Sequence, residues 1–249
     1  MIVHFGDRQF DASWVAFDKD GTLLDFEWMW GRLAEAWVDR LAGQPGQEVL
    51  RRELFRSMGY DPLRRRTEPQ SPLAIATTTQ IQTIVAGTLY REGVSWPEAE
   101  DLARLAFETG QELPLASLVR PAGDLAGLLT QLQGAGVRVA VVTTDLRADT
   151  QETLRLLGVD RLIDQLVCGD DGLPSKPAPE MLLAAAQGLG LDPARCAVVG
   201  DTLGDLWMAE RAGSGLKVAV LTGAGDPALL AEHADVVLAS IDEIRVADE

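Results

Sequence analysis

The chain has 249 residues, and its 38 Asp+Glu outnumber its 22 Lys+Arg, which gives a formal net charge of −16. Hydrophobic residues make up 47% of the sequence, a value typical of globular proteins that excludes a mainly disordered chain. The acidity argues against nucleic acid and anionic membranes as partners, because both attract basic surfaces. No apolar run approaches the roughly 20 residues of a membrane span, and no signal peptide is recognisable, so we expect a cytoplasmic protein.

The first 24 residues are predicted to form strands. Residues 2–5 and 8–10 flank Gly6 and Asp7, a pair suited to a two-residue hairpin turn. Residues 14–17 form a short apolar run that ends at Asp18.

Residues 25–118 are predicted to form an α-helical domain inserted after the first core strand. Apolar residues recur with helical spacing in four segments: 30–41, 49–58, 81–89 and 102–106. Ser95, with Glu98 three residues later, marks the start of the last helix. Four helices can bury their apolar faces against one another, and an insertion this long needs its own core.

Residues 1–24 and 119–249 together are predicted to form the other domain, an α/β core with a doubly wound, Rossmann-like parallel sheet. Beyond residue 120 the apolar patterns alternate between strands and helices, as expected of a parallel sheet covered on both faces. The expected strands are 137–142, 162–167, 196–199, 216–220 and 235–238, and the expected helices end at Gly158, Gly188 and Gly213. In such sheets ligands bind beyond the carboxyl ends of the strands.

Polar residues stand where these strands end: Asp18 and Asp20, Thr143 and Thr144, Lys176, and Asp201 with Asp205. Because the carboxyl ends of parallel strands share one edge of the sheet, we expect these side chains to meet there. Several carboxylates at close range disfavour one another's ionisation, and a divalent cation would relieve that conflict. Oxygen ligands without His or Cys indicate Mg²⁺.

The segment Asp18-Lys19-Asp20-Gly21-Thr22 follows the first core strand. In an extended chain residues i and i+2 face the same side, so the two carboxylates are expected to share a face while Lys19 points away. Gly21 allows a sharp turn and a close approach of backbone N–H groups to an anion. This pattern suits one nucleophilic carboxylate beside one acid/base carboxylate.

Lys176 stands out because Lys occurs only at positions 19, 176 and 217, and every other basic residue is Arg or His. A compact ammonium group before Pro177 is suited to contact a phosphoryl oxygen or a carboxylate. Thr143 is expected to donate its hydroxyl to a phosphate, and Thr144 mainly its N–H. Three consecutive arginines, 64–66, either recognise an anionic substrate group or form a solvated face, and the sequence leaves both readings open.

These motifs resemble those of the haloacid dehalogenase superfamily of phosphohydrolases. The matches are Asp18 to Leu23, Thr143 after an apolar strand, Lys176 to Pro179, and Gly200-Asp201 with Asp205. The helical insertion resembles the type 1 cap of phosphoglycolate phosphatase and β-phosphoglucomutase. The resemblance implies that Asp18 is the nucleophile, that Asp20 is the general acid/base, and that Thr143 and Lys176 hold the phosphoryl group. It further implies Mg²⁺ bound by Asp18, by the backbone carbonyl of Asp20 and by Asp201, with Asp205 in support.

The expected activity is Mg²⁺-dependent hydrolysis of a small phosphorylated metabolite, of the phosphoglycolate or sugar phosphate type, through an aspartyl-phosphate. Dehalogenases of the superfamily lack the second aspartate, so Asp20 argues against dehalogenation. A sugar phosphomutase and a non-catalytic module that binds phosphorylated metabolites are the alternatives. The sequence leaves the individual substrate and the oligomeric state open.

Overall fold

The structure, a computed structural model, describes residues 1–111 and 113–247, with the side chains of residues 109–111 left out. The chain divides into two compact units. The first unit consists of Met1–Phe26 and Val119–Glu249, and the second is Glu27–Leu118. Each unit has a hydrophobic core of its own, and each is described by itself.

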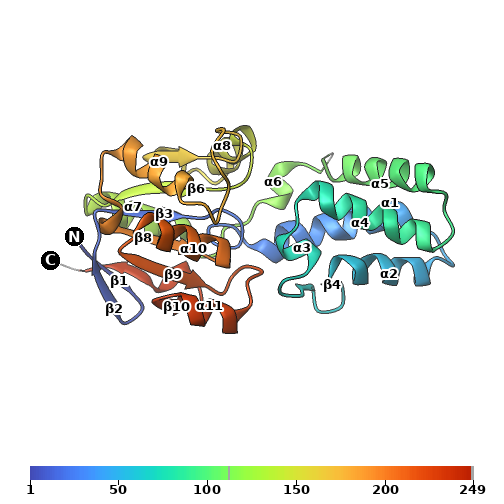
Figure 1. The fold of residues 1–249 in the computed structure, drawn as a ribbon, viewed down its shortest axis with the longest axis horizontal. Helices are drawn as coiled ribbons and strands as arrows, with labels where there is room; N and C mark the ends of the chain where they lie inside the picture. Colours follow the sequence, from blue (N-terminus) through green and yellow to red (C-terminus); the bar gives the residue numbers. More distant parts are fainter. Residues whose placement is uncertain (112, 248–249) are drawn as a thin grey trace. The chain divides into compact units, whose positions relative to one another are not determined.

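The first unit contains a six-stranded parallel sheet with the strand order β10-β9-β8-β3-β6-β7 (Figure 1). Its strands are β3 (Trp14–Phe17), β6 (Arg138–Val142), β7 (Gln165–Val167), β8 (Cys196–Gly200), β9 (Leu216–Val220) and β10 (Val236–Leu238). After β3 the chain adds β6 and β7 on one side and then returns to add β8 on the other. The strand order therefore reverses between β3 and β8, and ligands bind at such reversals in doubly wound sheets. This confirms the predicted α/β fold class.

Helices cover both faces of this sheet. Along β3 the side chains alternate, so Val15 and Phe17 share a buried cluster with Leu129 of α7 (Leu125–Gly134). Trp14 lies in the opposite cluster with Leu182 of α9 (Glu180–Leu189). The remaining helices are α8 (Arg147–Leu156), α10 (Leu203–Ala212) and α11 (Pro227–His233).

The N-terminal hairpin belongs to a second, three-stranded antiparallel sheet. β1 (Ile2–Phe5) pairs with β2 (Arg8–Asp11), as predicted, and also with β11 (Ile244–Val246), a strand that the sequence patterns did not indicate. Phe5 of β1 and Ile244 of β11 are buried in the same cluster as Val218 of β9. The small sheet thus covers apolar side chains on one face of the parallel sheet.

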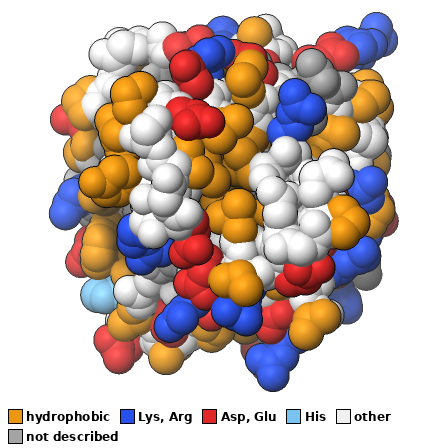
Figure 2. Space-filling view, turned by 90° about the vertical axis from the view of Figure 1, so that its right-hand side faces the viewer, with side chains coloured by type: hydrophobic (Ala, Val, Ile, Leu, Met, Phe, Trp, Pro, Cys, Tyr) orange, Lys and Arg blue, Asp and Glu red, His pale blue; other side chains and the backbone are white. Residues whose placement is uncertain are grey.

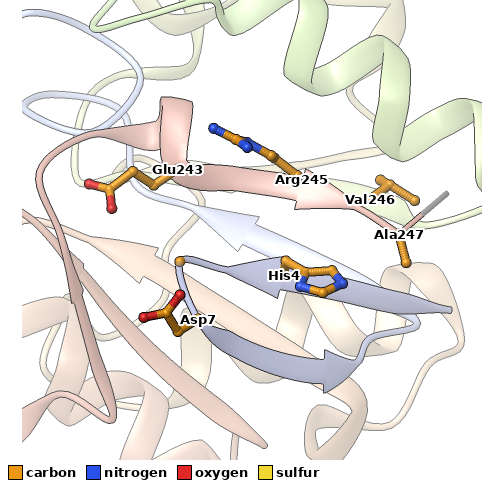
Figure 3. Close-up of a pocket in the computed structure, with 7 residues that line it drawn as sticks. His4, Asp7, Glu243, Arg245, Val246 and Ala247 are labelled. Atoms are coloured by element: carbon orange, nitrogen blue, oxygen red, sulfur yellow. The ribbon is translucent and has the colours of Figure 1, made fainter.

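A cavity of about 380 Å³ lies on this small sheet (Figure 3). His4 and Asp7 line it from the hairpin, and Glu243 and Arg245 line it from the C-terminal segment. None of its lining residues is a predicted site residue, so the candidate chemistry lies elsewhere in this unit.

The second unit is built mainly of helices, as predicted for the insertion. Its longer helices are α1 (Arg32–Ala42), α2 (Glu48–Met58), α4 (Thr78–Arg91) and α5 (Trp96–Gln111), and its short ones are α3 (Pro72–Ile75) and α6 (Leu115–Leu118). A π-helical turn, Glu27–Gly31, precedes α1. In the core Trp37 of α1 stacks on Phe107 of α5, with ring centroids 4.0 Å apart.

Two details of this unit differ from the sequence expectation. Between α2 and α3 the chain forms a hairpin, β4 (Tyr60–Asp61) with β5 (Arg66–Thr67), because Gly59 ends α2 in a left-handed conformation with φ 76°. The expected buried positions Leu102 and Leu105 of α5 are 37% and 42% exposed. Instead, the buried face of α5 is formed by small residues together with Phe107: Ala99, Ala103 and Ala106.

In the first unit two predicted boundaries also shift. The expected strand 162–167 is shorter, because Asp160–Leu162 is a 3₁₀ turn and only Gln165–Val167 pairs in the sheet. The helix expected to stop at Gly188 continues to Leu189 and is capped by Gly190 with φ 68°. These changes leave the carboxyl ends of the strands in place.

Among the described residues, no helix combines the length and the apolar character needed to cross a bilayer. Figure 2 shows one face of the molecule, where basic, acidic and apolar side chains are interspersed. On this face the basic side chains do not form one continuous patch.

Candidate active site

The register of the parallel sheet places the ends of its central strands side by side. Phe17, the last residue of β3, pairs with Val199 of β8 and with Val141 of β6. The N–H of Asp18 donates to the carbonyl oxygen of Val199 at 2.9 Å, so Asp18 is held at the end of β3. The residues that follow β3, β6 and β8 therefore share one edge, as predicted.

Lys176 joins Asp18 to Asp205. Its Nζ lies 2.6 Å from Oδ1 of Asp18 and 2.6 Å from Oδ1 of Asp205, and only 6% of its side chain is exposed. Asp205 is held in turn by a capping box at the start of α10, where its Oδ2 accepts from the N–H and the hydroxyl of Thr202. The start of a helix thus fixes the carboxylate that orients Lys176.

Asp18, Asp201 and Asp205 form a compact group of carboxylates. One oxygen from each lies within 4.8 Å of the others, and Asp201 and Asp205 are buried. Burial, followed by the charges of Asp18 and Asp205, raises the pKa of Asp201 well above its ordinary value. Lys176 supplies one positive charge to three carboxylates, so negative charge remains in excess, and the oxygen donors suit a divalent cation of the Mg²⁺ type. The side chain of Asp20 lies outside this group, and its implied contribution is a backbone carbonyl.

The loop after β9 supports Asp201, a role that the sequence did not reveal. The N–H of Ala224 donates to Oδ2 of Asp201 at 3.1 Å, and the hydroxyl of Thr22 lies 3.4 Å from Oδ1. Gly21, with φ +79°, and Gly223 both lie so close to Asp201 that a Cβ would clash with its carboxylate. The sequence signal that could have revealed this role is the run of small residues, Gly223 to Gly225, after β9, a strand that ends at the same edge of the sheet.

Lys19 does not point away from Asp20, so the expectation that it would point away is wrong. Its Nζ lies 2.7 Å from Oδ1 of Asp20 and 2.7 Å from Oδ2 of Asp145. The four-carbon side chain is flexible enough to turn back, and a buried ammonium group needs carboxylate partners. Asp145, on the loop after β6, was not a candidate from the sequence.

Thr143 and Thr144 follow β6, as predicted, but their environments differ. Thr143 is buried, its N–H donates to the carbonyl of Val167 at 2.9 Å, and its Oγ1 accepts from the N–H of Asp145 at 3.2 Å. A hydroxyl that accepts here can still donate its hydrogen to a phosphoryl oxygen. Thr144 is exposed, and its carbonyl lies against Gly169.

Burial raises the pKa of both motif aspartates, Asp18 and Asp20, toward neutrality. Burial raises the pKa of Asp18 to about 7, although Lys176 works in the opposite direction. Burial likewise raises the pKa of Asp20 to about 6, against the effect of Lys19. For Lys19 and Lys176 burial lowers the pKa, but the paired carboxylates outweigh it, so the pKa of each lysine lies above its ordinary value. A carboxyl group that titrates near pH 6 can both donate and accept a proton.

The arginines at 64–66 lie in the second unit, at the β4–β5 hairpin. The side chains of Arg64 and Arg65 are mostly exposed, and they lie 3.7 Å from Asp61 and 3.8 Å from Glu35. The structure thus gives each of them a carboxylate neighbour within its own unit.

The family of haloacid dehalogenase-like hydrolases matches residues 12–213. The chain belongs to this family. The match includes every predicted site residue and the whole helical insertion, in agreement with the resemblance drawn from the motifs.

Two relatives and one solved structure illustrate the similarity. A phosphoglycolate phosphatase of Neisseria meningitidis is 29% identical over 92% of this chain and 91% of its own length. A validoxylamine A 7′-phosphate phosphatase of Streptomyces hygroscopicus is 31% identical over 92% of this chain and 94% of its own. A crystal structure of a HAD family hydrolase from Deinococcus radiodurans, with bound phosphate and sodium, has a TM-score of 0.67. It is 24% identical and covers 94% of this chain and 93% of that one, which shows the shared fold.

The protein is therefore a phosphoric monoester hydrolase of the haloacid dehalogenase-like family. The relatives are named phosphatases of small phosphorylated compounds, which supports the same coarse activity here.

Proposed function

We propose that this protein is a Mg²⁺-dependent phosphatase that hydrolyses a small phosphorylated metabolite through an aspartyl-phosphate on Asp18. One observation carries the proposal. Asp18 lies at the end of the central strand β3, where it contacts the buried Lys176 and belongs to one carboxylate group with Asp201. The proposed nucleophile, the ammonium group of Lys176 and the carboxylates proposed to bind the metal would thus lie together where the strand order reverses, which supports the proposal.

In the first step a carboxylate oxygen of Asp18 attacks phosphorus, and the bond to the leaving oxygen breaks. Asp20 gives its proton to that oxygen, which departs as an alcohol. Lys176 and the hydroxyl of Thr143 contact the transferring phosphoryl group, with further donation from the N–H of Thr144. These donors and the ammonium group of Lys176 would then stabilise the negative charge of the phosphoryl oxygens.

In the second step Asp20 takes a proton from water, which attacks phosphorus and releases inorganic phosphate. The bond between Asp18 and phosphorus breaks, so the free carboxylate returns. Asp18, Asp201 and the backbone carbonyl of Asp20 would hold Mg²⁺, which would supply positive charge to neutralise the phosphoryl group. Asp205 acts through Lys176, which it contacts at 2.6 Å.

Residues 25–118 are proposed to serve as the cap that selects the substrate, while residues 1–24 and 119–249 carry the chemistry. The cap contains Arg64 to Arg66, cationic side chains that could recognise a second anionic group on a substrate. A cytoplasmic location is proposed as well, since Cys168 and Cys196 are both free and buried, which fits a reducing compartment.

The test is release of inorganic phosphate from a panel of phosphorylated metabolites, each assayed with Mg²⁺ and with EDTA. Hydrolysis of at least one compound, abolished by EDTA and inhibited by Ca²⁺, is expected, because Ca²⁺ prefers looser coordination with more ligands. Full turnover after exhaustive chelation contradicts the metal dependence. Isomerisation of a sugar phosphate without free phosphate would indicate a phosphomutase, and tight binding without turnover would indicate a binding module.

A further inference from the structure

Lys19 is buried within the loop that carries the two motif aspartates. Only 2% of its side chain is exposed, and its Nζ lies 2.7 Å from both Asp20 and Asp145. The two carboxylates come from different loops, since Asp20 follows β3 and Asp145 follows β6. The ammonium group therefore bridges two loops at the carboxyl edge of the sheet.

The other buried lysine of the site, Lys176, forms a similar bridge between two carboxylates. Lys176 contacts Asp18 and Asp205 at 2.6 Å each, so each lysine joins one motif aspartate to an aspartate of another segment. Lys occupies only three positions among 22 Lys+Arg, and two of the three form these bridges. An ammonium group offers three donors from one compact centre, whereas a planar guanidinium would need more room.

The Lys19 bridge also reaches the residue proposed to bind phosphate. The N–H of Asp145 donates to Oγ1 of Thr143 at 3.2 Å. The contacts therefore run from Thr143 through Asp145 and Lys19 to Asp20. They connect a side chain that would contact the phosphoryl group with the one that would protonate the leaving oxygen.

We infer that Lys19 is a positioning residue that orients the Asp20 carboxyl group for proton transfer to the leaving oxygen. The inference rests on the proposed function, in which Asp20 is the general acid/base. Lys19 contacts Oδ1 of Asp20, which directs Oδ2 to carry the transferred proton. Without the ammonium group, Asp20 would lose the contact that joins it to Asp145 and Thr143, and its carboxyl group would no longer be held in its working position.

The experiment measures the first turnover, with enzyme in excess, on phenyl phosphate and p-nitrophenyl phosphate. The two probes are similar in size, but phenolate is the more basic leaving group and needs the proton more. Lys19→Met should slow phenol release about 100-fold and p-nitrophenol release less than about 10-fold, because general acid catalysis matters most for the poorer leaving group. A purely structural role for Lys19 would slow both reactions equally.

Two further variants distinguish a failure of the inference about Lys19 from a failure of the proposed function. Lys217→Met removes the one lysine outside the site and should leave both rates unchanged. Asp20→Asn should show the same selectivity for the leaving group as Lys19→Met. If Asp20→Asn lacks that selectivity, the acid/base assignment in the proposed function fails. If Asp20→Asn shows it and Lys19→Met does not, only the role of Lys19 is overturned.

Asp145→Ala keeps the test decisive if Lys19→Met does not fold. About a third of the Asp145 side chain is exposed, at 34%, so its removal perturbs the core less. The variant removes one end of the bridge and should slow phenol release about 10-fold more than p-nitrophenol release. Equal losses on both substrates would overturn the inference.

Discussion

Gly223 lies directly against Asp201: a Cβ at position 223 would come within 1.9 Å of Oδ2 of that carboxylate. The contact comes from the loop after β9, whereas Asp201 follows β8. The absence of a side chain at 223 is therefore a requirement for the position of the buried carboxylate proposed to bind Mg²⁺.

Gly223→Ala should displace Asp201 and weaken Mg²⁺ binding by about 10-fold or more, the size expected when the support of a metal ligand is lost. Isothermal titration with Mg²⁺ measures the change. Gly134→Ala is the matched control in the same unit, because a Cβ there meets nothing within 4 Å. Unchanged Mg²⁺ affinity in Gly223→Ala would show that Asp201 does not hold the metal.

The edge of the sheet that carries the site could be predicted because Asp18, Thr143 and Asp201 each directly follow a short apolar strand. Asp18 after β3 and Asp201 after β8 are local features of the sequence, and parallel pairing then brings them together. By contrast, the role of Gly21 and Gly223 could not be predicted, because these glycines are required only by their contact with Asp201, which is distant in the sequence.

Contacts between distant segments could not be predicted in the same way. Lys19 was expected to point away because side chains alternate along an extended chain. That alternation does not determine where the end of a long, flexible side chain lies. Asp145 contacts it from a loop more than a hundred residues later, without a motif of its own. Likewise, β11 is only three residues long, and it forms a strand because it pairs with β1.

Lys176→Arg should lower kcat by about 100-fold, equivalent to about 2.7 kcal/mol. The two carboxylates lie 2.6 Å from Nζ in a nearly closed space, and a planar guanidinium cannot take that position without moving Asp18. Steady-state assays with p-nitrophenyl phosphate measure the loss, and Lys217→Arg on β9 serves as the control. Near-normal turnover in Lys176→Arg would place Lys176 outside the reacting centre.

The metal-free protein should lose stability as the pH rises from about 5 to about 8. Burial raises the pKa of Asp18 to about 7, from 3.8, so the folded protein binds this proton more tightly than the unfolded chain does. The stabilisation from that proton is complete below the unfolded pKa and is lost as the pH passes through 7. We expect Tm in EDTA to fall by about 5 °C or more, and Mg²⁺ to restore most of it at the higher pH.

Asp18→Asn provides the control for this pH dependence, since the amide cannot titrate. Its Tm in EDTA should fall less between the same two pH values and should respond less to Mg²⁺. A Tm of the metal-free wild type that rises from about pH 5 to about pH 8 would contradict the assignment of a raised pKa to Asp18.

Asp20→Asn should separate the two chemical steps. With p-nitrophenyl phosphate the leaving group is a weak base, so Asp18 can still attack without a proton donor, although more slowly. The aspartyl-phosphate would then lack a base to activate water, and it should accumulate. We expect a burst of p-nitrophenol close to one equivalent per active site, followed by very slow turnover.

Rapid mixing with excess substrate measures this burst, and intact mass spectrometry of the quenched protein detects the added phosphoryl group. Asp18→Asn should give neither the burst nor the adduct, because it removes the attacking carboxylate. A phosphoryl adduct that survives Asp18→Asn would place the nucleophile on another residue. Normal steady turnover by Asp20→Asn, without a burst, would show that Asp20 does not transfer the proton in either step.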